Sequence, residues 1–245
     1  MATQRGPKIA RDGLILCLDV ADKKSYSGSG ATAWNDLSGN LADASVSGSP
    51  SFNTSNGGSI VFDKNNDFAT ITNNTRFRFA NTDPFSISFW TYWTGAGGTA
   101  VDYLLAYAAD NYGSGYYIGL DNGASRTNAF FFDYYNAQDT NKFKGIQGLT
   151  NALVKNQWMN IVFTNLNNSA TNMKFYRNGA LGSYDIRGDV SPATITYTSL
   201  NLRVGVRSNT DYYNGRIASV LVYNRQLSDL EVLNNFNAQR GRFGI

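Results

Sequence analysis

Short apolar segments separated by turn residues recur along almost the whole chain. From Gly13 onward, alternating or continuous apolar runs such as "GLILCLDV", "FSISFWTYW" and "GRIASVLVY" are bounded by stretches rich in Gly, Asn and Pro. This pattern is typical of β-strands that are joined by tight turns. Because no helical pattern separates these strands, a βαβ arrangement with a parallel sheet is excluded. We therefore expect an all-β fold.

The strands that this pattern predicts extend over most of the chain. They cover residues 14–20, 59–63, 67–72, 85–93, 103–108, 115–121, 128–135, 157–166, 172–181, 199–207 and 215–224. One of these segments contains Asn178 and Gly179 between two alternating runs. A type I′ turn favours such a pair, because both of its central residues have a positive φ angle. We predict a β-hairpin that turns at this pair.

The composition supports one large domain with a sizeable core. The length of 245 residues suits a single sandwich or barrel, and 42% of the residues are apolar and 14% aromatic. Charged residues make up 16%, and the densest basic groups, Lys23–Lys24 and Arg76–Arg78, are too short to bind a polyphosphate backbone. No stretch approaches the roughly 20 apolar residues that a transmembrane helix needs. We expect neither nucleic acid nor membrane as a partner.

The end of the chain departs from the strand pattern and carries the start signal of a helix. Ser228 can accept a hydrogen bond from the backbone N–H of Glu231, whose side chain can reach back to Ser228 in a capping box. Leu227 and Val232 occupy the two positions of a hydrophobic staple around this box. These signals predict one short helix at about residues 228–240.

An apolar stripe predicts how this helix docks. Leu230, Leu233 and Phe236 recur at the spacing that places side chains on one face of a helix. Gly241 follows and is available as the left-handed residue that ends the helix. We expect the stripe to pack on the sandwich.

Several segments together resemble the concanavalin A-like lectin/glucanase jelly rolls, in their laminin G-like branch. The resemblance covers about residues 13–245. Its segments are "DGLILCLDVADKKSYSGSGATAWNDLSGN" (12–40), "GGSIVFDKNNDFATI" (57–71), "PFSISFWTYW" (84–93), "NQWMNIVFT" (156–164), "MKFYRNGAL" (173–181) and "NGRIASVLVYNRQLSDLEVLNNFNAQRGRFGI" (214–245). The opening "WNDLSGN" and the closing "YNRQLSDLEVLNNFNAQRGRFGI" resemble versions of this domain in virion proteins of tailed bacteriophages.

The resemblance implies a fold of two antiparallel sheets, each of six or seven strands, packed face to face around the core. It also implies a structural protein of the virion, such as a capsid decoration, fibre or tail component. Residues 1–12 are polar, and we expect them to form an arm that docks on another virion protein; a homo-oligomer is left open. The residues expected to dock are Arg5, Pro7, Lys8 and Arg11. Because the arm lacks the apolar region of a signal peptide, we expect synthesis in the host cytoplasm before assembly into the virion.

The sequence lacks residues that hydrolytic chemistry needs. A glycosidase uses two carboxyl groups across the scissile bond, but Glu231 is the single glutamate and is assigned to the helix cap. The hydrolases of the family that the chain resembles carry a strand motif Glu-x-Asp-x-x-Glu, which does not occur here. Without histidine, a Ser-His-Asp triad and a typical zinc site are excluded. We expect a protein without enzymatic activity.

Without histidine, only metals that bind oxygen ligands remain. Calcium is the one to consider, since lectin and laminin G relatives often bind it. Asp63, Asn65 and Asp67, or Asp110 with Asn111, carry suitable side chains. Neither group has the ligand count of a full calcium shell, and turn formation is the ordinary role of Asp and Asn in such loops. We therefore expect no cofactor, with calcium as the alternative.

The alternative function is that of a lectin that recognises carbohydrate on the host surface. Sugar recognition uses exposed aromatic rings, which stack on pyranoses, beside Asn and Asp side chains that bind hydroxyl groups. The loops "DNYGSGYY" and "TDYYNG" offer both. The candidate glycan-binding residues are Asp110, Asn111, Tyr112, Tyr116, Tyr212 and Tyr213. The competing interpretation is that these tyrosines fill the sandwich and extend only their hydroxyl groups to water.

Overall fold

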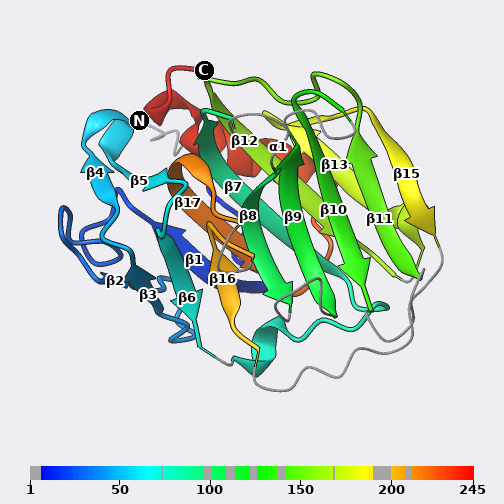
Figure 1. Ribbon diagram of the computed structural model, residues 1–245, viewed down its shortest axis with the longest axis horizontal. Helices are drawn as coiled ribbons and strands as arrows, with labels where there is room; N and C mark the ends of the chain where they lie inside the picture. The colour runs from blue at the N-terminus through cyan, green and yellow to red at the C-terminus, as the bar shows by residue number, and fades with distance from the viewer. Residues whose placement is uncertain are drawn as a thin grey trace, which may run out of the picture.

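The computed structural model shows two stacked antiparallel β-sheets, followed by a short helix at the end of the chain (Figure 1). This arrangement confirms the predicted all-β sandwich with one C-terminal helix. The structure describes residues 7–72, 74–95, 101–108, 114–121, 126–136, 142–167, 169–189, 200–207 and 211–245.

The first layer is an eight-stranded sheet. In spatial order its strands are β14 (Ala180–Leu181), β13 (Lys174–Arg177), β12 (Trp158–Asn165), β7 (Phe85–Trp93), β17 (Asn214–Tyr223), β5 (Ser59–Asp63) and β4 (Ser51–Asn53), and β1 (Leu14–Asp19) pairs with β17 outside this order. The long strands β7 and β17 lie side by side at its centre, so they carry most of its hydrogen bonds to neighbours.

The second layer is a nine-stranded sheet, which faces the viewer in Figure 1. In spatial order its strands are β15 (Tyr184–Asp189), β11 (Phe143–Gly148), β10 (Ala129–Tyr135), β9 (Gly115–Asp121), β8 (Val101–Ala108), β16 (Leu202–Val204), β6 (Phe68–Ile71), β3 (Ala44–Ser47) and β2 (Ala33–Trp34). Four consecutive strands, β8 to β11, form an antiparallel meander at its centre.

The inner faces of both sheets meet in one core that is rich in aromatic rings. Phe130 and Phe132 of β10 contact Phe163 of β12, with ring centroids 5.0 and 5.6 Å apart. Phe85 of β7 meets Phe132 edge to face at 5.7 Å. Edge-to-face contacts add to the free energy gained from burial, because ring edges and ring faces carry opposite partial charges. These contacts hold the two layers in a fixed relation.

Each sheet has more strands than the six or seven that the resemblance implied. Strands β2, β4 and β14 span only two or three residues, and alternation cannot be seen over so short a distance. Strand β15 has the sequence "YDIRGD" and is mostly exposed at the sheet edge. Because β15 is exposed to solvent, its sequence has no clear apolar face. The alternation of apolar and polar residues therefore does not predict this strand.

The predicted hairpin turn is confirmed. Asn178 and Gly179 connect β13 to β14 with φ angles of +52° and +78°, as a type I′ turn requires. The side-chain oxygen of Asn178 also accepts a hydrogen bond of 2.9 Å from the backbone N–H of Asn160 on the neighbouring strand β12. Asparagine therefore serves both the turn and the sheet.

The loop motif "WNDLSGN" is organised by the carboxylate of Asp36. Its Oδ1 accepts hydrogen bonds from the backbone N–H groups of Cys17 (2.8 Å) and Ser38 (2.9 Å). Its Oδ2 accepts a hydrogen bond of 2.6 Å from the Ser38 hydroxyl. These bonds tie the loop to β1, so the motif has a structural role.

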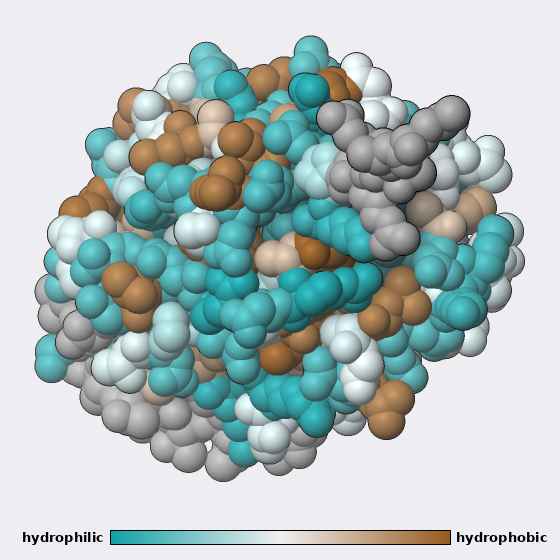
Figure 2. All heavy atoms as spheres, turned by 180° about the vertical axis from the view of Figure 1, so that it is seen from behind, coloured by the Kyte–Doolittle hydropathy of each residue, from teal (hydrophilic) through white to brown (hydrophobic). Residues whose placement is uncertain are grey.

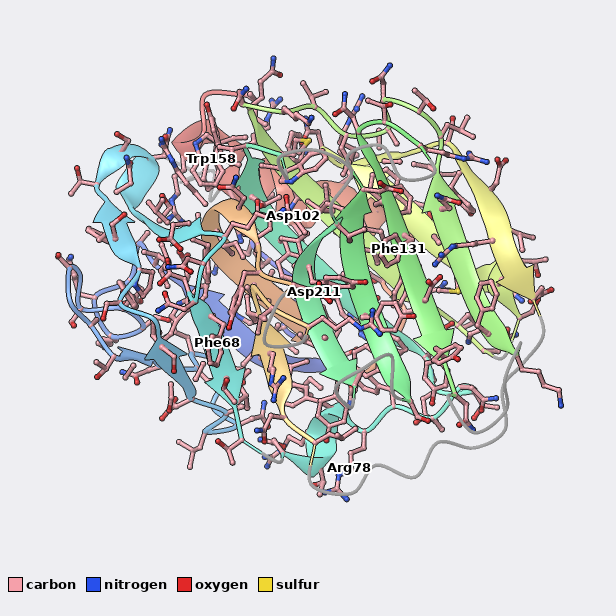
Figure 3. The ribbon with its side chains drawn as sticks, viewed as in Figure 1. Phe68, Arg78, Asp102, Phe131, Trp158 and Asp211 are labelled. Atoms are coloured by element: carbon pink, nitrogen blue, oxygen red, sulfur yellow. The ribbon has the colours of Figure 1, made fainter. Side chains whose placement is uncertain are left out.

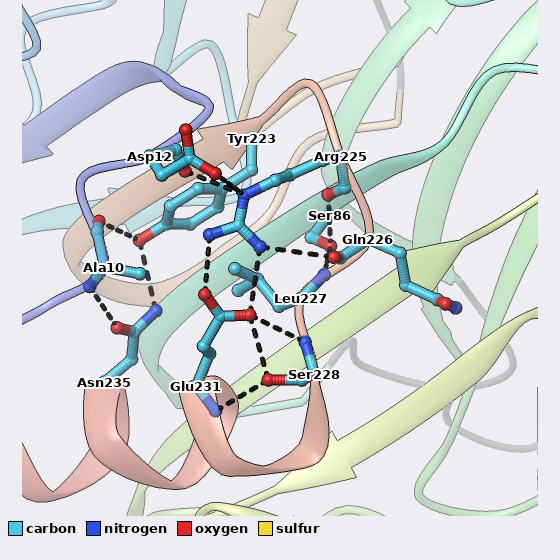
Figure 4. A network of polar contacts seen from close by, with 10 residues as sticks. All are labelled: Ala10, Asp12, Ser86, Tyr223, Arg225, Gln226, Leu227, Ser228, Glu231 and Asn235. Carbon is cyan, nitrogen blue, oxygen red and sulfur yellow. Dashed lines mark hydrogen bonds and ion pairs between the residues drawn. The ribbon is translucent and has the colours of Figure 1, made fainter.

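The C-terminal helix α1 (Asp229–Gln239) begins as predicted, with Ser228 as its N-cap. The Ser228 hydroxyl accepts a hydrogen bond from the Glu231 N–H at 3.3 Å, and the Glu231 carboxylate accepts one from the Ser228 N–H at 2.9 Å. The guanidinium of Arg225 donates to both carboxylate oxygens of Glu231 (Figure 4). Hydrogen bonds from Arg225 lower the pKa of Glu231 to about 2, with smaller contributions from Ser228. The single glutamate is thus fully used by the cap.

The buried face of α1 differs from the predicted one. Val232, Asn235 and Phe236 are buried, whereas Leu230 and Leu233 are 65% and 41% exposed. The spacing of apolar residues does not indicate this buried face, because a polar residue such as Asn235 is expected to face solvent. Asn235 is buried because it is hydrogen bonded to other parts of the chain, which offsets the cost of burying its amide.

The chain continues past α1 and does not end the helix at Gly241 as predicted. Residues Arg240–Arg242 form a 3₁₀ turn, and Gly244 is the residue with positive φ, at +72°. This path brings the ring of Phe243 onto Trp90 of β7, at a centroid distance of 4.0 Å and an interplanar angle of 13°. The tail therefore helps to cover the outer face of the eight-stranded sheet.

Part of the N-terminal arm is held by the C-terminal part of the same chain (Figure 4). The N–H of Ala10 donates to Oδ1 of Asn235 at 2.7 Å, and the Tyr223 hydroxyl donates to the Ala10 carbonyl at 3.1 Å. Arg225 forms an ion pair with Asp12, with Nε 2.9 Å from the carboxylate. Ala10 and Asp12 of the arm are thus tied to the C-terminal part of the chain.

The side that carries α1 has a mixed surface. Figure 2 shows this side from behind, with hydrophobic residues scattered among hydrophilic ones. Among the described residues, no helix combines the length and the apolar character that crossing a membrane requires.

Candidate functional site

Two of the predicted glycan-binding tyrosines lie in the core, which corrects the sequence-based assignment. Tyr116 and Tyr213 are both fully buried. The hydroxyl of Tyr116 donates to the carbonyl of Phe77 at 2.9 Å, and that of Tyr213 pairs with the hydroxyl of Thr91 at 2.6 Å. A ring committed in this way cannot stack on a sugar. The competing interpretation, in which the tyrosines fill the sandwich, is correct for these two residues.

The other predicted sugar-binding residues do not form a common site in the described part of the chain. Tyr212 is half-buried and its ring packs against Phe68, with centroids 6.3 Å apart. Asp110, Asn111 and Tyr112 lie outside the described residues.

The residues predicted to dock on a partner lie at the start of the chain. Pro7, Lys8 and Arg11 are exposed, and Arg5 lies outside the described residues. Exposure leaves the first three available to a partner, so the docking role stays a prediction.

Asp63, Asn65 and Asp67 are close together, but they surround a turn. Oδ1 of Asp63 accepts a hydrogen bond of 2.9 Å from the Asn65 N–H, and Oδ2 of Asp67 accepts one of 3.2 Å from the Asp63 N–H. Burial, together with the nearby Asp63 carboxylate, raises the pKa of Asp67 to about 6. Over the described ranges, no group of three or more acidic, histidine or cysteine side chains is placed to hold a metal ion. Turn formation accounts for the contacts of these three residues.

The outer face of the nine-stranded sheet carries a residue cluster that the sequence analysis did not single out. Alternation along β10 points Phe131, Asp133 and Tyr135 away from the core (Figure 3 labels Phe131). The register places Tyr117 of β9 and Gly145 of β11 on either side of Asp133. Three neighbouring strands therefore bring their side chains together at one point.

Aromatic rings and two arginines occupy the centre of this face. The rings of Tyr103, Tyr117 and Phe131 pack edge to face, with centroids 5.8 to 6.0 Å apart. The guanidinium of Arg187 lies 4.9 Å from the Phe131 ring, and that of Arg207 lies 4.5 Å from the Tyr117 ring. Cations are attracted to ring faces, more strongly where water is excluded. Arg207 is buried, and its Nη1 donates to the Tyr103 hydroxyl at 2.8 Å.

Asp133 is a buried acid of this face and interacts with both arginines. Its Oδ2 forms an ion pair with Nη1 of Arg187, whereas its Oδ1 has no hydrogen-bond partner. Burial raises the pKa of Asp133 to about 7, although the positive charges of Arg187 and Arg207 oppose this rise. A glycine at position 145 is required, because a Cβ on Gly145 would collide with the carboxylate. The site thus holds a carboxyl group that titrates near neutral pH and has one unused acceptor.

A cavity of about 160 Å³ opens beside Asp133. Its lining residues are Tyr117, Asp133, Tyr135, Phe143 and Arg187. Tyr135 and Phe143 are half-buried, and the Arg187 side chain is 37% exposed. The cavity therefore combines aromatic walls with one acceptor and one charged donor. Asp133 is the single acid of the lining, whereas glycoside hydrolysis uses two carboxyl groups.

Two larger hollows lack this pairing of an acid with a cation beside aromatic rings. One, of about 310 Å³, includes Arg177, whose guanidinium already donates to the carbonyl of Ala152 at 2.7 Å. The other, of about 320 Å³, is lined by small residues, among them the hydroxyl residues Ser29, Thr32, Ser49 and Ser51, and has no charged side chain. Small-molecule sites combine apolar walls with a few placed polar groups, so the cavity beside Asp133 is the stronger candidate.

One signal in the sequence could have located this site. Strand "AFFFDYY" contains an aspartate among aromatic residues, and alternation places Asp133 on the same face as Phe131 and Tyr135. The predicted glycan-binding residues include Tyr116, which faces the core, and not its neighbour Tyr117, which faces outward.

A comparison with protein families agrees with the fold. The family model described as the concanavalin A-like lectin/glucanases superfamily matches residues 63–233, which include β10 and β11 and most of both sheets. No curated protein matches the sequence.

Solved structures with the same fold are binding domains of clostridial toxins. The binding domain of Paraclostridial Mosquitocidal Protein 1 has a TM-score of 0.67 at 22% identity, over 93% of this chain and 52% of that chain. The binding domain of botulinum neurotoxin serotype D/C VPI 5993 has a TM-score of 0.69 at 20% identity, over 94% and 53%. The receptor binding domain of botulinum neurotoxin D has a TM-score of 0.66 at 19% identity, over 94% and 53%. The chain spans about half the length of these structures, and the likeness concerns the fold.

Proposed function

Because the chain belongs to the concanavalin A-like lectin/glucanases superfamily, we propose that it is a non-enzymatic domain that binds carbohydrate on a cell surface. The observation that carries this proposal is the cavity beside Asp133, where half-buried rings surround a carboxylate and a guanidinium. Aromatic walls with a few fixed polar groups are what sugar recognition requires. The names of the solved relatives, which are binding and receptor-binding domains, also support recognition rather than catalysis.

The binding face is the outer side of the nine-stranded sheet. Its strands β9, β10 and β11 supply the cavity walls, so a rigid sheet rather than a loop positions Tyr117, Asp133 and Tyr135. One small cavity gives weak binding to a single sugar, because few atoms of the ligand are buried. Display of many copies would raise the avidity for a cell surface well above the affinity of one site.

A glycan array tests this proposal with the full chain presented in multivalent form. We expect binding to defined glycans that falls at least about tenfold in Tyr135→Ala and Phe143→Ala, since each loses one wall of the cavity. Tyr92→Ala is the matched control, because Tyr92 is a half-buried tyrosine of the other sheet. Absence of binding to any glycan, or an equal loss in the control, would contradict the proposal.

A second function, that of a structural protein in the virion of a tailed bacteriophage, is favoured by the exposed start of the chain. In this proposal Arg5, Pro7, Lys8 and Arg11 dock on a capsid, fibre or tail protein, or on a second copy of the chain, within the virion. The exposure of Lys8 and Arg11 and the resemblance of the "WNDLSGN" and closing segments support it. The two functions are compatible, because the arm and the cavity lie on different parts of the molecule.

Deletion of residues 1–8 tests the virion role. The shortened chain keeps Ala10 and Asp12, which contact Asn235 and Arg225, so we expect it to fold. We expect it to be missing from purified particles in which the full chain is found by mass spectrometry. Equal incorporation of both chains would show that residues 1–8, with Arg5, Pro7 and Lys8, do not attach the protein.

A further inference from the structure

Asp133, which lines the cavity, has one carboxylate oxygen without a hydrogen-bond donor. Asp133 is 1% exposed, and its Oδ1 has no partner while Oδ2 is paired with Arg187. A buried acceptor without a donor is costly, and such groups in folded proteins call for a specific explanation. A ligand that donates a hydrogen bond would supply the missing partner.

The charges around the cavity favour a neutral ligand. Arg207 is turned into the rings of Tyr103 and Tyr117 and donates to the Tyr103 hydroxyl. Arg187 is the cation of the lining, and its Nη1 is already paired with the Asp133 carboxylate. An acidic sugar would bring its carboxylate close to that of Asp133, and like charges repel strongly where solvent is excluded.

The size and the walls of the cavity favour one sugar ring. A volume of about 160 Å³ lies below the range of about 300–1,000 Å³ that is usual for pockets of drug-sized ligands. Tyr135 and Phe143 present half-buried rings to it. A pyranose has an apolar face that can cover such a ring, and its hydroxyl groups lie around the edge, where Asp133 and Arg187 can reach them.

We propose that this cavity is a subsite for one neutral pyranose, with one hydroxyl donating to the Asp133 carboxylate and a neighbouring hydroxyl accepting from Arg187. The inference rests on the proposed function and names the ligand class of that site. Neutral hexoses and N-acetylhexosamines fit this description. Sialic and uronic acids do not, because their carboxylate would lie beside that of Asp133, and the Arg187 guanidinium of the lining is already paired with Asp133.

The test measures the binding of immobilised full chain to albumin that carries single sugars, by surface plasmon resonance at pH 8. The neutral probes are glucose, galactose, mannose and N-acetylglucosamine, and the acidic probes are glucuronic acid and N-acetylneuraminic acid. We expect at least one neutral conjugate to bind and both acidic ones to fail. Asp133→Asn should weaken the neutral binding at least about tenfold, because an amide is a poorer acceptor than a carboxylate.

The matched control is Asp185→Asn, which neutralises an exposed acid on β15 that is paired with Arg126. It should leave binding unchanged. Stronger binding of an acidic conjugate would overturn the neutral class, and neutral binding that survives Asp133→Asn would overturn the subsite while the glycan-binding function stands. Failure of every glycan on the array would remove the function itself. If circular dichroism shows that Asp133→Asn is not folded, the binding of the neutral conjugates is measured with Tyr135→Ala instead, because this substitution leaves the buried charges intact.

Discussion

The outer faces of the two sheets are both rich in aromatic residues, but they are covered in different ways. On the eight-stranded sheet, Trp90 lies between Phe236 of α1 and Phe243 of the tail, with centroid distances of 5.7 and 4.0 Å. On the nine-stranded sheet, the rings of Tyr117 and Phe131 lie under the guanidinium groups of Arg207 and Arg187. One face is therefore completed by an apolar element of its own chain, and the other by two charged side chains.

This difference separates a structural face from a face that can bind a ligand. Stacking of three rings buries apolar surface permanently, and nothing in that arrangement can exchange with a ligand. The arginine-covered face has a cavity, a half-exposed Arg187 and an unpaired acceptor on Asp133. Polar groups held over rings keep both stacking and hydrogen bonding available.

The largest expected effect is loss of stability in Trp90→Ala. Trp90 is 1% exposed and fills the space between the sheet, α1 and the tail. Removal of a buried Trp or Phe ring costs about 3–5 kcal/mol, because the surroundings do not close the cavity completely. Urea denaturation of the variant should show this loss in the free energy of unfolding. Tyr92→Ala, in the same strand but half-buried, is the control and should lose much less. A similar small loss in both variants would mean that α1 does not cover this face tightly.

The next effect concerns the pH dependence of stability on the opposite face. The folded pKa of Asp133 is raised to about 7, whereas the unfolded value is about 3.9. The contribution of this group to stability is therefore complete below about pH 4 and is lost as the pH rises through 7, because the folded state binds the extra proton. Relative to Asp133→Asn, we expect the free energy of unfolding of the wild type to fall by roughly 4 kcal/mol between pH 4 and pH 8.

Urea titrations at several pH values would measure this difference. Tyr117 stays neutral across the range because burial raises its pKa, so it adds little to the slope. A difference between wild type and variant that does not depend on pH would show that Asp133 is not buried as an acid on this face.

The sequence predicted those parts of the fold that depend on local signals. The Asn178–Gly179 turn and the capping box of Ser228 and Glu231 are each defined within a few residues, and both are confirmed. The face of α1 was predicted only in part: Phe236 is buried as expected, but Leu230 and Leu233 are exposed, although they are more apolar than the buried Asn235. Burial of Asn235 depends on its bond to Ala10, which lies 225 residues away in the chain. No local pattern contains that information.

Asp133 among the aromatic residues of β10 indicates the centre of the candidate site, but the rest of the site could not be predicted, for a related reason. Strand β9 is buried on every residue, so its sequence does not show which of Tyr116 and Tyr117 faces outward. The site also depends on the register that places Gly145 opposite Asp133 and on the ion pair that Arg187 makes from β15. The pairing of β10 with β11 and of β11 with β15 sets both of these contacts, and a single sequence does not reveal which strands pair or in which register.

A smaller effect is expected at the cap of the helix that covers the structural face. Ser228→Ala removes the acceptor for the Glu231 N–H, and loss of such a cap costs about 1 kcal/mol. Hydrogen exchange should become faster at the start of α1, while Trp90 remains covered by the rest of the helix and the tail. Ser27→Ala, at an exposed serine outside the helix, should change neither the exchange nor the free energy of unfolding. Unchanged exchange in Ser228→Ala would contradict the role of the cap.

The smallest expected effect on stability is that of Tyr135→Ala. Its ring is half-buried at the mouth of the cavity, and substitutions away from tightly packed contacts usually change stability by less than about 1 kcal/mol. Trp90 and Tyr135 are both large aromatic residues on outer faces, so a large loss for the first and a small one for the second would establish that only one face is needed for folding. Urea denaturation of the two variants side by side gives this comparison. A loss of about 3 kcal/mol or more in Tyr135→Ala would place its ring in the core and remove it as an exposed wall for a sugar.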